Sequence, residues 1–118
     1  MGTNPRPMLF GYQTVRPDSS DDEVTNGRRL LVAYAALEGY TLGEIFLEWT
    51  PGTSFSALSA LVVTAERCRV RTVAVPSALD LGRLPRVQEL VRRKLESGGL
   101  TVLVLQSMEP QAVRRWSA

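Results

Sequence analysis

The sequence predicts a three-layer α/β domain with a mainly parallel sheet of four or five strands. Short apolar runs alternate with longer segments of helical periodicity in the order β-α-β-α-β-α-β, and loop-forming residues separate them. Parallel strands follow because a helical crossover joins each strand to the next. The chain of 118 residues, 44% hydrophobic, suffices for one domain with its own core.

The N-terminal half predicts two strands and one helix. Residues 1–7 form a flexible lead-in rich in small and proline residues, and residues 8–15 form the first strand, with both faces covered. A polar loop, 16–22, precedes a helix over about 23–37, because its acidic residues favour a helix N-terminus. Gly39 ends this helix. Its predicted buried stripe is Leu30, Ala33, Tyr34 and Leu37.

The middle of the chain predicts a strand, a helix and a further strand. Residues 42–49 form the second strand, and the following Thr-Pro-Gly-Thr-Ser run breaks it. A helix over 56–68 takes its N-cap from Ser54 or Ser56. Residues 70–75 form the third strand, which ends at Pro76. The apolar stripe predicted for the helix is Ala57, Leu58, Leu61, Val62 and Ala65.

The C-terminal third predicts the last helix and strand. A loop over 77–84 leads into a helix that begins at Pro85 and ends at the Ser-Gly-Gly run 97–99. The apolar run 100–105 is typical of a strand covered on both faces, so the domain extends over 8–106. The tail, 107–118, is either frayed or the start of a short helix. The stripe of the last helix is Val87, Leu90, Val91 and Leu95.

Composition excludes several kinds of chemistry. The chain contains no histidine, which removes Ser-His-Asp and Cys-His nucleophile systems. Its single cysteine, Cys68, allows no internal disulfide and is expected to be a small buried hydrophobe. No Gly-rich phosphate-binding loop follows the first strand, so we expect no cofactor. The absence of a long apolar run predicts a cytoplasmic protein without a membrane segment.

The loops after the strand ends are the expected place for a site, because ligands of parallel sheets bind at the carboxyl ends of the strands. We interpret the polar run 16–22 as a solvated loop and helix cap. A less favoured reading lets carboxylates converge on a divalent cation, and we predict no metal site. Trp49, at the end of the second strand, is expected to anchor the structure. The carboxylates concerned are Asp18, Asp21, Asp22, Glu48 and Asp80.

Several strings of the sequence resemble the catalytic domain of serine recombinases of the resolvase/invertase type. They are GYQTV at 11–15, LLVAYAALEGYTLGEIFLEW at 30–49, SALSALV at 56–62, VAVPSALDLGRL at 73–84 and TVLVL at 101–105. The resemblance covers residues 8–106 and implies a resolvase-like α/β fold. In that family a serine attacks a DNA phosphate and becomes covalently linked to it.

The residues at the family's active-site positions depart from its pattern. The family's first strand reads Gly-Tyr-x-Arg-Val-Ser, which matches Tyr12 but places Thr14 at the arginine and Arg16 at the nucleophilic serine. The second motif, Asp-Arg-Leu-x-Arg, places Asp80 at its first arginine and retains Arg83 at its last. The arginine expected at the start of the second helix is replaced by Phe55 or Ser56.

These departures predict a catalytically inactive recombinase-like domain that acts as an interaction or regulatory module, through self-association or a protein partner. One alternative is DNA strand exchange or nicking by an unorthodox site that uses Ser19 or Ser20. A second alternative is a small non-catalytic DNA-binding protein in which Arg16, Arg83 and Arg86 contact the phosphates of the DNA. The net charge of only +2 does not by itself indicate nucleic-acid binding.

Overall fold

Four parallel strands form one sheet in the order β2-β1-β3-β4 in the computed structural model, which describes residues 6–49 and 55–107. The strands are β1 (Met8–Val15), β2 (Thr41–Trp49), β3 (Thr72–Val75) and β4 (Thr101–Val104). Strand β1 pairs with both β2 and β3, and β3 pairs with β4. The predicted parallel sheet is confirmed, with four strands in the described part of the chain.

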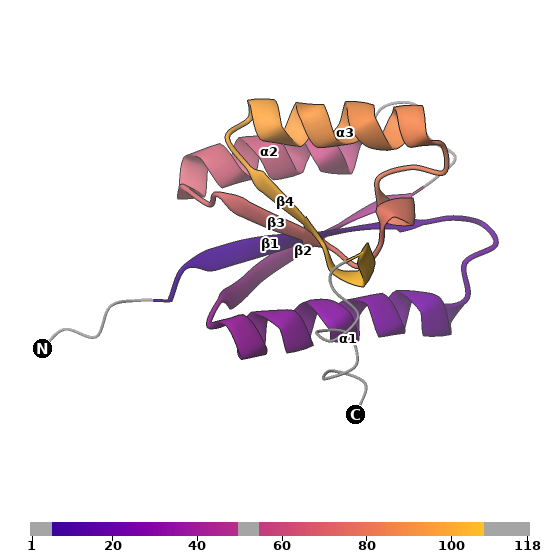
Figure 1. The fold of residues 1–118 in the computed structure, drawn as a ribbon, viewed down its shortest axis with the longest axis horizontal. Coiled ribbons are helices and arrows are strands. Elements are labelled where there is room, and N and C mark those ends of the chain that lie inside the picture. The colour runs from indigo at the N-terminus through magenta and orange to yellow at the C-terminus, as the bar shows by residue number, and fades with distance from the viewer. Residues whose placement is uncertain (1–5, 50–54, 108–118) are drawn as a thin grey trace, which may run out of the picture.

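Helices cover both faces of this sheet. Helix α1 (Asp21–Glu38) lies on one face, and α2 (Ser56–Cys68) and α3 (Pro85–Ser97) lie on the other (Figure 1). The core is divided accordingly. One cluster, which includes Phe10, Leu58 and Leu95, packs under α2 and α3, and a smaller one, which includes Leu31 and Tyr34, packs under α1. The three-layer prediction is therefore confirmed.

Helix α1 begins two residues earlier than predicted. The Ser20 side chain accepts a hydrogen bond from the Glu23 N–H, so the N-cap lies ahead of the acidic first turn. At the other end Gly39 adopts φ 79°, and the stop predicted there is confirmed. The predicted stripe is partly wrong, because Leu37 is 60% exposed. The helix buries Tyr34, as predicted, together with Gly27, Leu31 and Ala35.

Helix α2 has the predicted bounds and stripe but an unexpected N-cap. Leu58, Leu61 and Ala65 are buried. Ser54 lies outside the described residues, and Ser56 is the first helical residue rather than the cap. The capping residue is Phe55, at φ 49°, and its side chain makes no capping bond. The carboxylate of Glu48 on β2 performs the capping, since it accepts the N–H groups of Ala57 and Leu58.

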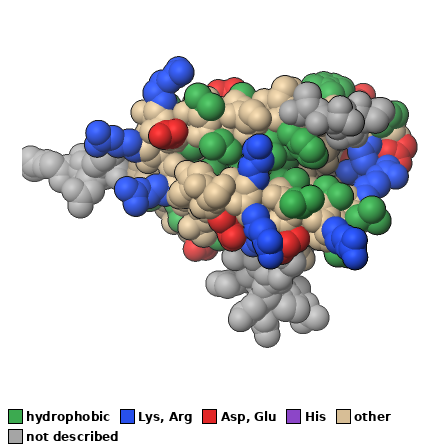
Figure 2. Space-filling view, turned by 90° about the horizontal axis from the view of Figure 1, so that it is seen from above, with side chains coloured by type: hydrophobic (Ala, Val, Ile, Leu, Met, Phe, Trp, Pro, Cys, Tyr) green, Lys and Arg blue, Asp and Glu red, His purple; other side chains and the backbone are tan. Residues whose placement is uncertain are grey.

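Helix α3 begins where predicted, and three side chains, Leu90, Cys68 and Trp49, are exposed. Pro85 occupies the first turn of α3, as predicted. Val91 and Leu95 are buried there, but Leu90 is 66% exposed and was wrongly placed in the stripe. Cys68 is also exposed, so the prediction that it is buried is wrong, and Trp49, which was expected to anchor the structure, is 68% exposed. Figure 2 shows the α2 and α3 side, where hydrophobic side chains lie among charged ones.

Two short 3₁₀ helices follow the ends of β3 and β4. The predicted loop contains η1 (Ala78–Asp80), and the end of the predicted fourth strand continues into η2 (Leu105–Ser107). Strands β3 and β4 are thus shorter than predicted. The lead-in and the C-terminal tail fall mostly outside the described residues, so their predicted bounds stay predictions. No described helix has the length and apolar character needed to cross a membrane.

Candidate functional site

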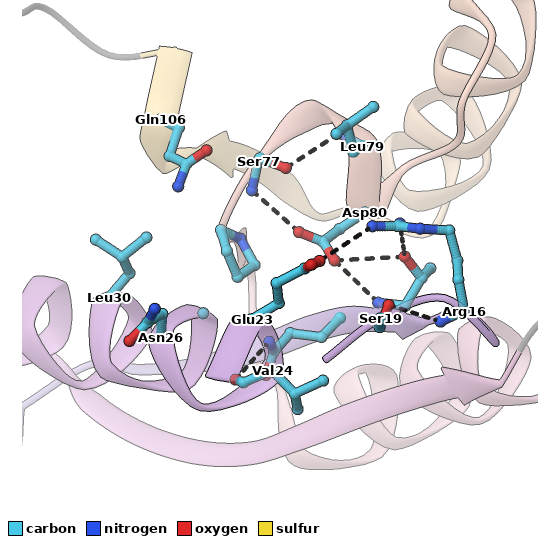
Figure 3. A pocket seen from close by; sticks show the side chains of 14 residues that line it. Arg16, Ser19, Glu23, Val24, Asn26, Leu30, Ser77, Leu79, Asp80 and Gln106 are labelled. Atoms are coloured by element: carbon cyan, nitrogen blue, oxygen red, sulfur yellow. Dashed lines mark hydrogen bonds and ion pairs between the residues drawn. The ribbon is translucent and has the colours of Figure 1, made fainter. Parts of the chain in front are cut away.

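A cavity of about 290 Å³ lies at the carboxyl ends of β1 and β3 (Figure 3). Strand β2, which follows β1 in the chain, pairs with one edge of β1, whereas β3 pairs with its other edge. Ligands of open parallel sheets bind where the strand order reverses in this way. The cavity is lined by Thr14 near the end of β1 and Arg16 just after it, by Ser77 and Asp80 after β3, and by Glu23 and Asn26 of α1.

Asp80 is the central polar residue of this cavity. Its Oδ1 accepts the Thr14 N–H at 3.0 Å and the Thr14 hydroxyl at 3.4 Å, and its Oδ2 accepts the Ser77 N–H at 3.1 Å. The Ser77 hydroxyl in turn accepts the Leu79 N–H, so η1 begins with a capping box. Burial raises the pKa of Asp80, and the hydrogen bonds and Arg16 oppose that rise.

Arg16, at the predicted nucleophile position, fills part of the site with its own guanidinium. Its side chain is 19% exposed, and Nη1 donates to the Thr14 hydroxyl at 3.4 Å. Nε lies 3.8 Å from a carboxylate oxygen of Asp18, and Nη2 lies 4.0 Å from one of Glu23. Figure 3 shows Arg16 directed towards Asp80 and Glu23. The positive charge of Arg16 therefore lies within 4.0 Å of two carboxylates.

Ser19 and Ser20, the serines nearest the predicted nucleophile position, both make hydrogen bonds within the loop. Ser19 Oγ accepts the Arg16 N–H at 3.0 Å, and the Ser19 N–H donates to the Arg16 carbonyl at 2.9 Å. Ser20 Oγ is the N-cap of α1 and accepts the Glu23 N–H at 3.1 Å. Of these two, only Ser19 lines the cavity. Both hydroxyls thus have structural roles in the turn that starts α1.

The other predicted site residues lie outside the cavity. Tyr12 is buried in the core under α2 and α3, where its hydroxyl donates to Glu48 at 3.2 Å. Burial and the neighbouring carboxylate raise the pKa of this phenol. Arg83 is exposed and forms an ion pair with Asp18 at 3.2 Å. Arg86 is exposed in the first turn of α3.

Sequence reasoning missed the amide side chains that line the cavity. Gln13 is buried, and its Nε2 donates to the Val24 carbonyl, which holds α1 against β1. Asn26 and Gln106 also line the cavity. A glutamine in the middle of a strand predicted to be covered on both faces was the available signal, since buried amides require partners.

The carboxylates considered for a cation are separated by the fold. Glu48 lies under α2, Asp80 bonds to β1, and Asp18 pairs with arginines. Within residues 6–49 and 55–107, no group of three or more histidine, cysteine, aspartate or glutamate side chains could hold a metal ion.

Comparison with solved structures identifies the class of fold. The C-terminal catalytic domain of ISC1926 TnpA, an IS607-like serine recombinase, is similar with a TM-score of 0.69 at 18% identity, over 93% of this chain and 76% of that one. The N-terminal catalytic domain of TP901-1 integrase gives 0.63 at 17%, over 93% and 88%. A serine recombinase from Sulfolobus solfataricus gives 0.57 at 15%, over 95% and 78%.

The α/β fold of this chain therefore matches that of serine recombinase catalytic domains. No protein-family model matches the sequence, and no curated protein does. At these identities the likeness concerns the fold, and the residues of the site have to be judged by their own geometry.

Proposed function

We propose that this chain is a catalytically inactive serine-recombinase-like domain that acts as an interaction or regulatory module. The observation that carries the proposal is the set of contacts of Arg16. Its guanidinium stands where the resemblance places the nucleophilic serine, and it is held by the Thr14 hydroxyl and by the carboxylates of Asp18 and Glu23. An arginine is always protonated and cannot attack a phosphate.

The electrostatics of the cavity also favour an inactive domain. Recombinase chemistry needs cations around the scissile phosphate to stabilise its developing charge. Here the Asp80 carboxylate occupies the cavity, and Glu23 lines it as well. The resemblance places Asp80 where the family's motif has its first arginine, so the site lacks that cation.

The nicking alternative requires a displaced nucleophile, and the two nearest serines are poorly suited to that role. Ser19 Oγ accepts the Arg16 N–H, and Ser20 Oγ accepts the Glu23 N–H in the first turn of α1. The chain has no histidine, and the nearby carboxylate Glu23 is occupied by Arg16. Neither serine therefore has a histidine to remove its proton, and each hydroxyl oxygen is already engaged as an acceptor.

The experiment is an assay for covalent attachment to DNA. Supercoiled plasmid is incubated with the protein, and SDS-resistant protein–DNA adducts and nicked circles are measured on gels. We expect neither product from the wild-type chain or from the Ser19→Ala/Ser20→Ala double variant. A covalent adduct formed by the wild-type chain would overturn the proposal, and its loss in the double variant would assign the reaction to these serines.

A further inference from the structure

The cavity at the carboxyl ends of β1 and β3 has room for a small ligand. Its volume of about 290 Å³ lies at the small end of the range of about 300–1,000 Å³ that is typical of ligand pockets. It also lies at the switch point of the sheet, where open parallel sheets bind their ligands. Because the proposed inactive domain holds no DNA phosphate there, the lining side chains define which ligand fits.

Three primary amides from three different elements line this cavity. Gln13 comes from β1, Asn26 from α1 and Gln106 from η2. Gln13 is only 4% exposed, and its Nε2 donates to the Val24 carbonyl, whereas its Oε1 accepts no hydrogen bond from the described residues. The side chains of Asn26 and Gln106 make no hydrogen bond within residues 6–49 and 55–107. These amides therefore offer free donors and acceptors to a ligand.

The fold fixes the positions of these amides. A hydrogen bond of 3.0 Å from the Gln106 N–H to the Pro76 carbonyl holds η2 against the end of β3. Gly27 lets the buried amide of β1 approach α1, since a Cβ at this position would collide with the amide nitrogen. Asn26 and Leu30 are one turn apart on α1 and therefore share a face of the helix. Figure 3 shows Asn26, Leu30 and Gln106 at one end of the cavity.

Charged and hydroxyl groups line the rest of the cavity. Its charged residues are Arg16, Glu23 and Asp80, one positive and two negative, so the lining has a net charge of −1. Asp80 already accepts three hydrogen bonds. Glu23, paired with Arg16 at 4.0 Å, accepts no hydrogen bond on its side chain from the described residues, and the Ser77 hydroxyl accepts one but keeps its proton to donate. These groups favour the hydroxyls of a ligand over a phosphate.

We propose that this cavity binds a neutral nucleoside, with the base at the three amides and the ribose hydroxyls at Glu23 and Ser77. A primary amide presents a donor and an acceptor side by side, which matches the edge of a base, as Asn and Gln do with adenine. Carboxylates also accept ribose hydroxyls in the nucleotide sites of parallel sheets. Leu30, Pro76 and Leu79 line the cavity as apolar surface for the faces of the base.

The absence of a phosphate-binding loop agrees with a ligand that carries no phosphate. No Gly-rich loop of that kind follows β1 in the sequence. The inference rests on the proposed inactive regulatory module, and it names the ligand to which that module responds.

The first test measures nucleoside binding with matched variants. Isothermal titration calorimetry with adenosine, guanosine, cytidine and uridine should give the wild-type chain a dissociation constant below about 1 mM for at least one of them. Asn26→Ala and Gln106→Ala should each weaken this binding about three- to tenfold. Thr25→Ala, at an exposed neighbour that does not line this cavity, is the control and should leave the affinity unchanged. Circular dichroism confirms that all three variants fold.

A wild-type chain that binds none of the four nucleosides in this range would overturn the proposal. Folded Asn26→Ala and Gln106→Ala variants that bind as tightly as the wild-type chain would also overturn it. Equal weakening by Thr25→Ala would contradict the placement of the base at the amides.

The second test locates the ribose. The 2′,3′-dideoxy form of the nucleoside that binds best lacks both ribose hydroxyls and should bind the wild-type chain about three- to tenfold more weakly. In Glu23→Ala this difference should shrink, because the acceptor is already missing. Asp22→Ala removes the neighbouring carboxylate, which does not line the cavity, and should retain the full difference. An equal difference in Glu23→Ala and the wild-type chain would contradict the contact.

The third test adds a phosphate to the ligand. The 5′-monophosphate should bind more weakly than the nucleoside itself, because like charges meet in a lining of net negative charge. Tighter binding of the monophosphate would overturn the assignment of a neutral ligand. These titrations contain no DNA, so a failure to bind nucleosides and the formation of a covalent DNA adduct are separate results.

Discussion

Thr14 and Asp80, separated by 66 residues in the chain, are joined by two hydrogen bonds to one carboxylate oxygen. The Thr14 N–H donates to Oδ1 at 3.0 Å and the Thr14 hydroxyl donates at 3.4 Å. The other oxygen of Asp80 accepts the Ser77 N–H. The carboxylate therefore connects the end of β1 to the start of η1 and holds the floor of the cavity.

Removal of this carboxylate should destabilise the domain. Asp80→Ala leaves the N–H groups of Thr14 and Ser77 without their acceptor, at a cost of about 1–3 kcal/mol in the free energy of unfolding. Asp80→Asn retains one acceptor oxygen and should lose less. Urea denaturation measures both variants. Equal stability of Asp80→Ala and the wild-type chain would show that the carboxylate has no structural role.

Asp80 should also make the stability depend on pH in a defined direction. Burial raises its pKa in the folded chain above the ordinary value of 3.8, so the folded state binds this proton more tightly than the unfolded state. Its contribution to the free energy of unfolding is therefore complete below pH 3.8 and is lost as the pH rises through the pKa of Asp80 in the folded chain.

The stability of the wild-type chain relative to Asp80→Asn should accordingly fall as the pH rises across this window. Urea denaturation of both proteins at several pH values measures the difference and cancels the contributions of the other carboxylates. A difference that grows with pH would contradict the direction of the shift.

Glu48 should be among the most sensitive positions of the core. Its carboxylate accepts the Tyr12 hydroxyl and two N–H groups at the start of α2. Glu48→Ala leaves these three donors, two of them buried, without their acceptor and should cost about 2–4 kcal/mol. Tyr12→Phe removes one donor only and should cost about 1 kcal/mol. Thermal denaturation of both variants tests this order, and a reversed order would contradict the capping role of Glu48.

Gly27 should not tolerate a larger residue, although it lies inside a helix. A Cβ at this position would meet the Gln13 amide nitrogen, and the Pro76 Cγ would lie 3.1 Å away. Helix propensity favours alanine over glycine by about 1 kcal/mol. The overpacking between α1 and β1 should cost more than this, so we expect the variant to be less stable by about 1–3 kcal/mol. Asn26→Ala, at an exposed neighbour, is the control and should be neutral or stabilising. A stabilised Gly27→Ala variant would refute the close contact.

DNA binding, if present, should not depend on Arg83. Its guanidinium is exposed and already paired with Asp18, so Arg83→Ala should change the affinity for a labelled duplex by less than about twofold. Fluorescence anisotropy at low and at physiological salt measures this. Salt-sensitive binding that the substitution abolishes would instead favour the alternative of a DNA-binding protein.

The sequence by itself determined the order of the elements, the bounds of β1 and α2 and the stripe of α2, because local periodicity and local stop signals specify them. It also determined that no histidine chemistry is available. Local pattern failed at Leu37, Leu90 and Cys68, which helical periodicity or residue type wrongly placed in the core.

Only the tertiary structure decided how distant residues meet. The contacts of Thr14 with Asp80 and of Glu48 with α2 depend on which strands become neighbours and on where the following helices begin. The exposure of Leu47 and Trp49 has the same origin, since an apolar alternation does not tell whether a strand is central or terminal. Strand order is a long-range property: it sets the position of the cavity and makes β2 a terminal strand of the described sheet.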